Sequence, residues 1–262
     1  MSTVPSGAPL LYVTQLSKAF RGVQALHEYA LSLRPYTLLG VIGPNGAGKT
    51  TLFNILTGVV TPDRGRIVFD GRDLTGAAPD AICRAGIART FQNIRLFRRM
   101  SVLDNVKVAL QARQSSHFFT AVLRPPRFYA QERMLSERAM ALLATLGLDA
   151  HTNLQADALP YGLQRRLEIA MALATEPKLL LLDEPAAGMN PTEADALMHL
   201  IVHLRDALKL TIILIEHNMR VVMGICERVQ VLNYGQLIAE GTPEEVQNDL
   251  RVLQAYLGAN TR

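Results

Sequence analysis

The chain of 262 residues has little of several features that would narrow its function at once. Its two cysteines, Cys83 and Cys226, are too few for a disulfide framework and do not have the spacing of zinc ligands, which suits a reducing compartment. No apolar run approaches the roughly 18–20 residues that a membrane-spanning helix needs. Residues 1–11 lack the basic start and long apolar stretch of a signal peptide. We therefore expect a cytosolic chain that touches a membrane only through a partner.

The chain also has little excess charge of either sign, with a formal net charge of +4. So small an excess does not indicate a nucleic-acid partner, although it is compatible with phosphate ligands or an anionic membrane surface. Hydrophobic residues make up 49% of the chain, which is enough to bury a large core. The length fits one large domain or a core with an added lobe.

Short apolar runs alternate with amphipathic helical stretches along the chain. The runs at Leu38–Ile42, Leu179–Leu182 and Ile212–Ile215 are apolar at every position, as in strands of a parallel sheet covered by helices on both faces. Tyr234-Gly235 lies between two further short runs and predicts a β-hairpin. The sequence therefore predicts an α/β fold with a mostly parallel sheet.

Two capping patterns predict where helices begin. Thr192 with Asp195 resembles a capping box that opens a helix after the second of these strands. The segment Thr242–Glu245 offers an N-cap threonine, a proline at the first helical position and a glutamate at the third. It predicts one C-terminal helix whose apolar face carries Val246, Leu250, Leu253 and Leu257.

The stretch from Asn93 to Leu159 carries few strand signals and several helical ones. One helical face is formed by Leu135, Ala139, Leu142, Leu143 and Leu146, and Gly147 can end that helix. The residues Arg124-Pro125-Pro126-Arg127 break the stretch in two. We predict a helical subdomain at residues 93–164, inserted into an α/β core made of residues 1–92 and 165–262.

The clearest motif is a glycine-rich loop, Gly43-Pro44-Asn45-Gly46-Ala47-Gly48-Lys49-Thr50, which matches G-x-x-x-x-G-K-[ST]. The backbone N–H groups of such a loop form a nest for anions, and the start of the next helix adds partial positive charge. Lys49 would bind the β- and γ-phosphates, the Thr50 hydroxyl would ligate Mg²⁺, and Thr51 would bind an α-phosphate oxygen. A chance glycine loop is the alternative, but the predicted strand before it and helix after it favour a nucleotide site.

An acidic pair, Asp183 and Glu184, follows the second apolar run. At the carboxyl edge of a parallel sheet both side chains would face the phosphates. Alternation along the strand directs Asp183 to the Mg²⁺ and Glu184 to the place of an attacking water. His217 follows the next strand and would donate a hydrogen bond to the γ-phosphate. A solvated strand end and a structural histidine are the ordinary alternatives, which the nearby glycine-rich loop makes less favourable.

In this order the motifs resemble those of the ATP-binding subunit of ABC transporters. The set consists of the glycine-rich loop, Phe91-Gln92, Leu159-Pro160-Tyr161-Gly162-Leu163-Gln164, the acidic pair and His217, and the resemblance runs from about Leu10 to Leu257. It implies a P-loop NTPase core of the ABC ATPase type, with ATP and Mg²⁺ as ligands. The implied activity is ATP hydrolysis coupled to transport.

The same resemblance implies further roles. Gln92 would be the glutamine that touches Mg²⁺ or the attacking water and links the core to the helical lobe. Phe20 lies where the family places an aromatic ring on adenine, with a packed core residue as the equal alternative. Tyr161 and Gly162, with a helix expected at Gln164–Thr175, belong to the signature segment, which binds the γ-phosphate held by a partner subunit. Two cassettes must therefore enclose two nucleotides.

Some residues depart from the family's common pattern. Pro160 replaces a serine and Tyr161 a glycine, so this half of the trans site loses hydrogen-bond donors. Asn190, in the D-loop position at residues 187–190, stands where aspartate is frequent. The signature segment, the residues after the acidic pair and the ending Arg251–Gly258 resemble the larger ATPase of branched-chain amino acid importers, a group that also serves urea and short amides.

The resemblance implies partners on the cytoplasmic side of the inner membrane. These are a second ABC ATPase subunit (a sister or a second copy), two transmembrane permease subunits and, indirectly, a solute-binding protein. A coupling helix of a permease would lie near Gln92–Phe97, where Arg95, Arg98 and Arg99 would pair with it or form an ordinary solvated face. The alternatives are the ATPase of a lipid-export ABC system or a soluble ABC ATPase in cofactor assembly. A P-loop GTPase or kinase is disfavoured, because Asn-Lys-x-Asp is absent and a kinase has no use for the signature segment.

Overall fold

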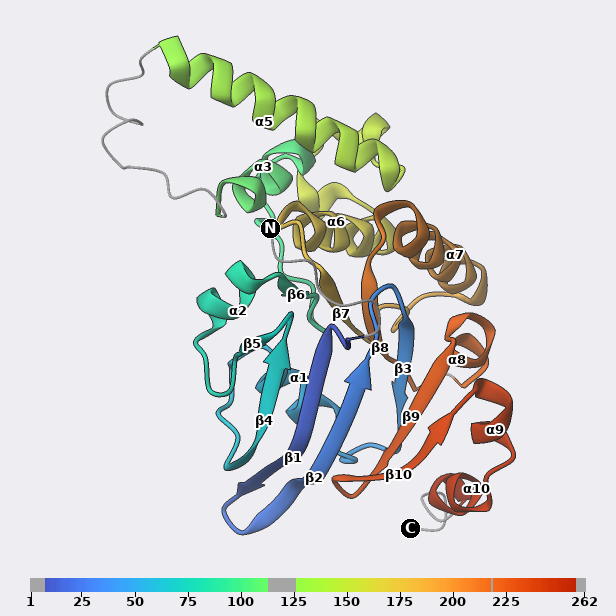
Figure 1. Cartoon of the computed structure of the whole chain (residues 1–262). Coiled ribbons are helices and arrows are strands. Elements are labelled where there is room, and N and C mark those ends of the chain that lie inside the picture. The colour runs from blue at the N-terminus through green and yellow to red at the C-terminus, as the bar shows by residue number, and fades with distance from the viewer. Residues whose placement is uncertain (1–7, 113–125, 218, 258–262) are drawn as a thin grey trace.

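A six-stranded, mostly parallel sheet forms the centre of the molecule (Figure 1). The computed structural model describes residues 8–112, 126–217 and 219–257. The strand order is β10-β9-β3-β8-β7-β6, in which β10 alone runs antiparallel to its neighbour. These strands are β3 (Leu38–Ile42), β6 (Ile87–Arg89), β7 (Leu179–Asp183), β8 (Thr211–Ile215), β9 (Arg228–Asn233) and β10 (Gln236–Gly241). The α/β fold and the three apolar strands predicted from the sequence are confirmed.

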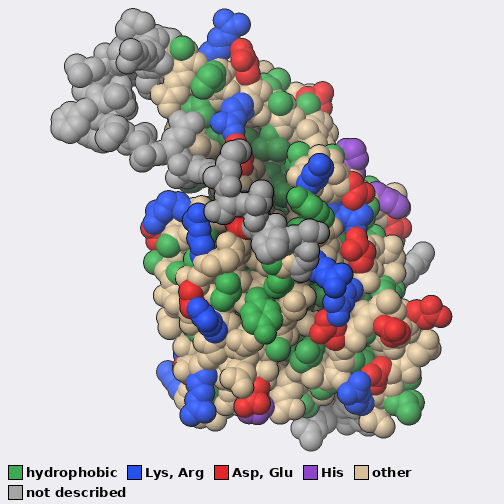
Figure 2. Space-filling model, viewed as in Figure 1, with side chains coloured by type: hydrophobic (Ala, Val, Ile, Leu, Met, Phe, Trp, Pro, Cys, Tyr) green, Lys and Arg blue, Asp and Glu red, His purple; other side chains and the backbone are tan. Residues whose placement is uncertain are grey.

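Basic and acidic side chains are interspersed over the face of the molecule shown in Figure 2, with hydrophobic side chains scattered between them. Within the described ranges, no helix has the length and apolar character that crossing a bilayer requires.

The apolar strands divide their side chains between two cores, one on each face of the sheet. In β7, Leu180 and Leu182 face one core, and Leu179 and Leu181 face the other. The same alternation holds in β3 and β8, which explains why these runs have no polar position. Every residue of the three strands is buried, so the sheet is covered on both sides.

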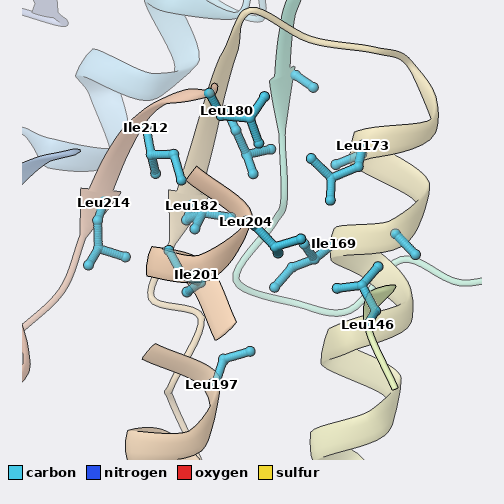
Figure 3. Packing of buried hydrophobic residues seen from close by; sticks show 14 of the residues in the cluster. Leu146, Ile169, Leu173, Leu180, Leu182, Leu197, Ile201, Leu204, Ile212 and Leu214 are labelled. Carbon is cyan, nitrogen blue, oxygen red and sulfur yellow. The ribbon is translucent and has the colours of Figure 1, made fainter. Parts of the chain in front are cut away.

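Helices cover the first face (Figure 3). Ile169 and Leu173 of α6 (Tyr161–Ala174) and Leu197, Ile201 and Leu204 of α7 (Pro191–Leu208) belong to the same buried cluster as β7 and β8. Beyond α6 lie α3 (Val102–Ala112) and α5 (Pro126–Thr145), at the end of the molecule away from the β1–β2 hairpin (Figure 1).

The second face is covered by α1 (Lys49–Leu56) and by an antiparallel sheet for which the sequence analysis made no prediction. Its strand order is β2-β1-β4-β5, with the short helix α2 (Pro79–Ala85) after it. The strands are β1 (Leu11–Phe20), β2 (Val23–Leu33), β4 (Arg64–Phe69) and β5 (Arg72–Asp73). The register of β1 shifts between Val13 and Leu16, and Gln15 has a φ of 49°. A bulge of this kind breaks the alternation by which an exposed sheet is recognised in a sequence.

The predicted helical stretch has the expected buried face. Leu135, Ala139, Leu143 and Leu146 are buried, and Gly147 lies at a φ of 67° just after the end of α5. Arg124 and Pro125, half of the expected break, lie outside the described residues. Helix α6 starts at Tyr161, three residues before the predicted start, because Pro160 has extended backbone angles and acts as its N-cap. The division into residues 1–92 plus 165–262 and residues 93–164 stays a prediction.

The predicted capping box of α7 is wrong by two residues. The Asn190 side chain accepts from the Glu193 N–H (2.9 Å), and the Glu193 carboxylate accepts from the Asn190 N–H (3.2 Å). Pro191 fixes this start, because a proline without an N–H fits the first helical position. Thr192 and Asp195 are therefore exposed residues inside the helix.

The C-terminal prediction is correct at its start and wrong in its continuation. Thr242 caps α9 (Pro243–Gln247) in the expected capping box, but a second helix, α10 (Leu250–Leu257), begins after a break. The Asp249 carboxylate accepts from the Arg251 N–H (2.8 Å), as an N-cap does. The break changes the buried face, so Val252 is buried whereas Leu250 is 72% exposed. The predicted hairpin is confirmed, with positive φ at both Tyr234 and Gly235.

The substitution Asn190→Ala should lower the free energy of unfolding by about 1 kcal/mol, because it removes the side chain that caps α7. Denaturant unfolding of the purified chain measures this loss. Thr192→Ala is the matched control and should change stability by less than about 0.5 kcal/mol. A larger loss in the Thr192 variant than in the Asn190 variant would contradict the observed cap.

Candidate active site

The predicted site residues come together at the carboxyl edge of the central sheet. The glycine-rich loop leaves β3, Asp183 ends β7, and His217 follows β8. These strands are direct parallel neighbours, with Asp183 paired to Ile215 across β7 and β8. Segments far apart in the sequence therefore meet at the place where an open α/β sheet binds its ligands.

The glycine-rich loop packs tightly against neighbouring backbone. A Cβ at Gly43 would lie 2.1 Å from the Leu232 carbonyl oxygen, and one at Gly48 would lie 2.5 Å from the Ala25 carbonyl oxygen. Both glycines have positive φ, 151° and 103°. A side chain at either position would displace the loop, whereas a Cβ at Gly46 (φ 78°) would meet only open space. The loop thus keeps its curvature and an open inner side.

Lys49 starts α1 and is buried under this loop. Its ammonium donates to the carbonyls of Gly43 (2.7 Å) and Pro44 (3.0 Å). Burial lowers the pKa of Lys49, and the charges of Glu184 and Asp183 oppose that shift. The lysine is therefore close enough to feel both acids. Thr50, next to it, is exposed at the start of the helix, and Thr51 is half-buried.

Asp183 is held by an arginine that the sequence analysis missed. The Arg89 guanidinium, at the end of β6, contacts the Asp183 carboxylate at 2.7 Å, and both side chains are nearly fully buried. Arg89 also donates to the Asn54 side chain of α1 (2.7 Å). The available signal was its position at the end of a short strand, at the same sheet edge as Asp183. A buried pair of this kind fixes the carboxylate in direction.

Glu184 has a strained backbone and three polar neighbours. Its φ is 46°, in the region that glycine favours, and such a residue costs about 1–3 kcal/mol unless its surroundings hold it. The Glu184 N–H donates to the Ile215 carbonyl (2.9 Å). Its carboxylate accepts from the Gln92 amide (3.2 Å) and lies 3.6 Å from Nδ1 of His217. The three predicted catalytic residues are therefore in one place.

Glu216, between β8 and His217, is a second buried acid that the sequence analysis did not single out. It is 1% exposed and accepts from the Ala186 N–H (3.0 Å). Burial raises the pKa of Glu216, while the Ala186 N–H and the charge of His217 act in the opposite direction. Through Ala186 this carboxylate positions the turn that follows Glu184.

The remaining predicted residues lie away from the acidic pair. Phe20 ends β1, is 44% exposed and has the Lys18 ammonium 5.5 Å from its ring centre. Its stacking on adenine stays a prediction. The Tyr161 hydroxyl donates to the Ala187 carbonyl (3.1 Å) of its own chain. Gly162, beside it, borders open space on its Cβ side. The signature segment is thus exposed at the start of α6.

This donor set fits a nucleoside triphosphate with Mg²⁺. Mg²⁺ prefers oxygen ligands and is usually held by one or two carboxylates plus substrate phosphates. Asp183, Thr50 and Gln92 offer one carboxylate, one hydroxyl and one amide oxygen. Among the described residues no group of three or more His, Cys, Asp or Glu side chains would hold a metal alone. The chain's residues are therefore those of a site that shares its metal with a phosphate.

A P-loop between a buried strand and a helix, with an acidic pair one sheet position beyond β8, defines a P-loop nucleoside triphosphatase. The family model described as ABC transporter matches residues 26–187, and one described as branched-chain amino acid ATP-binding cassette transporter matches residues 236–260. The chain belongs to the ABC transporter ATP-binding family, whose members bind nucleotide and hydrolyse ATP.

Two curated relatives and one solved structure are similar over nearly the whole chain. The high-affinity branched-chain amino acid transport ATP-binding protein LivG of Salmonella typhimurium (strain LT2) is 46% identical, covering 95% of this chain and 98% of LivG. The lipopolysaccharide export system ATP-binding protein LptB of Escherichia coli (strain K12) is 36% identical, covering 96% and 98%. The ADP conformation of MJ1267, an ATP-binding cassette of an ABC transporter, superposes with a TM-score of 0.82 at 30% identity, covering 95% and 98%.

The substitution Glu216→Gln should stabilise the chain at about pH 8. Since the native Glu216 binds its proton more tightly than the unfolded chain, stability falls as the pH rises above the ordinary pKa of 4.5. Glutamine cannot ionise and keeps an acceptor for the Ala186 N–H. Denaturant unfolding across the pH range should show a gain at high pH that shrinks toward 4.5. Glu137→Gln, on the exposed side of α5, is the control, and a gain independent of pH would contradict the burial of this charge.

Proposed function

We propose that this chain is the ATP-hydrolysing subunit of an ABC importer for branched-chain amino acids or related small solutes such as amides and urea. The observation that supports it most is the 46% identity to LivG over 98% of that protein. The match of residues 236–260 to the branched-chain amino acid model adds an independent segment, which includes β10, α9 and most of α10.

In this proposal Glu184 is the general base. It orients and deprotonates the water that attacks the γ-phosphate, because it is the acid that Gln92 and His217 approach at the open edge of the sheet. His217, 60% exposed, donates to the γ-phosphate. Phosphoryl transfer needs little covalent chemistry from the protein, so placing these groups and their charges supplies most of the catalysis.

The phosphates would lie in the loop from Gly43 to Thr51, with the Lys49 ammonium on the β- and γ-phosphates and the adenine against Phe20. Lys49 now donates to two loop carbonyls, and it would exchange these weak neutral acceptors for phosphate oxygens. Thr50, Gln92 and Asp183 would hold Mg²⁺, which supplies neutralisation of the charge that develops on the phosphates.

A second cassette, a sister subunit or another copy of this chain, would complete the site. Tyr161 and Gly162 lie at the start of a 14-residue helix whose N-cap is Pro160. A helix N-terminus offers free N–H groups to an anion, and the space beside Gly162 leaves room for one. These residues would bind the γ-phosphate of the nucleotide held by the other cassette, while Pro160 adds no hydroxyl.

A groove next to Gln92 would receive a coupling helix of a permease on the cytoplasmic side of the membrane. Its volume is about 410 Å³, and Phe91, Phe97 and Met171 give it an apolar lining. Arg95 lies at its edge, with its guanidinium 3.8 Å from the centre of the Phe91 ring. This places a cation where the partner's helix would carry a carboxylate, next to the residue that contacts Glu184. Two permeases and, through them, a solute-binding protein would complete the system.

The second candidate is the ATPase of a lipid-export system, which the 36% identity to LptB supports. The lower identity to LptB than to LivG, and the match at residues 236–260, favour import.

The substitution Glu184→Gln should lower the turnover number for ATP by about 10²–10⁴-fold while ATP still binds, because the amide keeps the shape of the side chain but not its basicity. Phosphate release and nucleotide-binding titrations measure the two properties. Lys49→Ala should instead lose nucleotide binding, since it removes the charge under the loop. ATP turnover at the parent's rate in the Glu184 variant would contradict the assignment of the base.

A tagged copy of the chain, purified from solubilised membranes of its own organism, should retain two multispanning permeases and a sister ATPase. Mass spectrometry identifies these proteins, and a copy with Phe97→Asp and Arg95→Glu should lose the permeases, because both changes reverse the groove's chemistry. Recovery of lipid-export components would decide for the second candidate.

A further inference from the structure

A closed ring of hydrogen bonds connects the Q-loop, the start of α6 and the turn after β7. The Gln92 amide donates to the Glu184 carboxylate (3.2 Å), and the Glu184 carbonyl accepts from the Ala187 N–H (3.1 Å). The Ala187 carbonyl accepts from the Tyr161 hydroxyl (3.1 Å). Arg165 closes the ring, because its Nη2 donates both to the Tyr161 hydroxyl (3.0 Å) and to the Gln92 carbonyl (2.9 Å).

Arg165 is the fixed point of this ring. Its side chain is fully buried, and its Nη1 donates to the Phe91 carbonyl (2.7 Å) and to the Glu168 carboxylate (2.8 Å). Glu168 in turn accepts from the Phe91 N–H (3.1 Å). A buried charge that loses such partners is strongly destabilised, so Arg165 cannot leave this place cheaply. The Q-loop backbone is therefore fastened to α6 at Phe91 and Gln92.

Tyr161 extends this attachment to the loop after β7. Tyr161 and Arg165 are four residues apart on α6, so they lie on the same side of the helix. The phenol ring lies against Gly188, where an added Cβ would be 3.6 Å from the ring. Gly188 has a φ of 79°, which lets the loop turn close to the ring. The hydroxyl is thus the one group by which Tyr161 joins this ring of hydrogen bonds to Ala187.

We propose that the Tyr161 hydroxyl is a positioning group for ATP hydrolysis in its own chain. It holds the turn that carries Glu184 against a buried anchor, and so it fixes the distance between the Glu184 carboxylate and Gln92. The inference rests on the proposed role of Glu184 as the base. It differs from the role in trans that the signature segment implies for Tyr161, because the ring of hydrogen bonds acts on a nucleotide bound to the same subunit.

The ring of hydrogen bonds predicts a specific kinetic signature. Without the hydroxyl the turn after β7 loses one restraint, so Glu184 spends less time in its productive position and kcat falls. The glycine-rich loop is not part of the ring, so the KM for ATP stays the same. A kcat loss at constant KM marks an interaction that matters in the transition state alone.

The substitution Tyr161→Phe in the full chain should lower kcat by about three- to tenfold, the effect of one neutral hydrogen bond, with KM for ATP unchanged within twofold. The melting temperature should stay within a few degrees of the parent's. Tyr12→Phe is the matched control, because Tyr12 on β1 is 45% exposed and Tyr161 is 43% exposed. This control should hydrolyse ATP at the parent's rate.

A double-mutant cycle separates the ring of hydrogen bonds from a contact in trans. Gln92→Ala removes the amide that donates to Glu184 and opens the ring at another point. In this background Tyr161→Phe should cost less than twofold, because the ring that it would break is already open. If Tyr161 acted only on the partner's nucleotide, the two losses would multiply.

Three results would overturn the proposal: unchanged kcat in the Tyr161 variant, a raised KM at constant kcat, or equal losses in the parent and Gln92→Ala backgrounds. These results leave the proposed function intact as long as Glu184→Gln loses turnover. Retained turnover in the Glu184 variant would instead remove the base on which the inference rests, so the two failures are distinguishable.

Discussion

Both faces of the parallel sheet are buried, one by helices and the other by a second sheet, and this constraint decides where polar chemistry can lie. Strands β3, β7 and β8 have no exposed residue, so charged side chains emerge only where the strands end. All parallel strands end at the same edge. Lys49, Asp183, Glu184 and His217 therefore gather there, although more than 160 residues of sequence separate the first from the last.

Buried charges at this edge are paired, and the pairs set the geometry of the site. Arg89 holds Asp183, and Arg165 and Glu168 hold the backbone of the Q-loop. Each pair crosses between secondary-structure elements: β6 to β7 in the first case, α6 to the loop after β6 in the second. Such pairs give little net stability, because desolvation offsets their attraction, but they fix direction. The phosphate-facing residues are thus supported by charges that never need to touch the nucleotide.

The apolar strands, the glycine-rich loop and the capped start of α9 could be predicted because each depends on a short, contiguous pattern. The start of α7 was misplaced, since Thr192–Asp195 and Asn190–Glu193 both have the form of a cap and only Pro191 decides between them. The antiparallel sheet escaped prediction because the bulge at Gln15 breaks its alternation. The single C-terminal helix was wrong because Asp249 caps a new one.

The sequence by itself determined the nucleotide chemistry of this protein, because the P-loop and the acidic pair place their chemistry within a few consecutive residues. Tertiary structure alone decided which groups support that chemistry. The pairing of Arg89 with Asp183 spans 94 residues and the contact of Gln92 with Glu184 spans 92. The register of neighbouring strands and the packing of α6 against the sheet bring these partners together. No local pattern encodes such a contact, since either partner alone is an ordinary charged or polar residue.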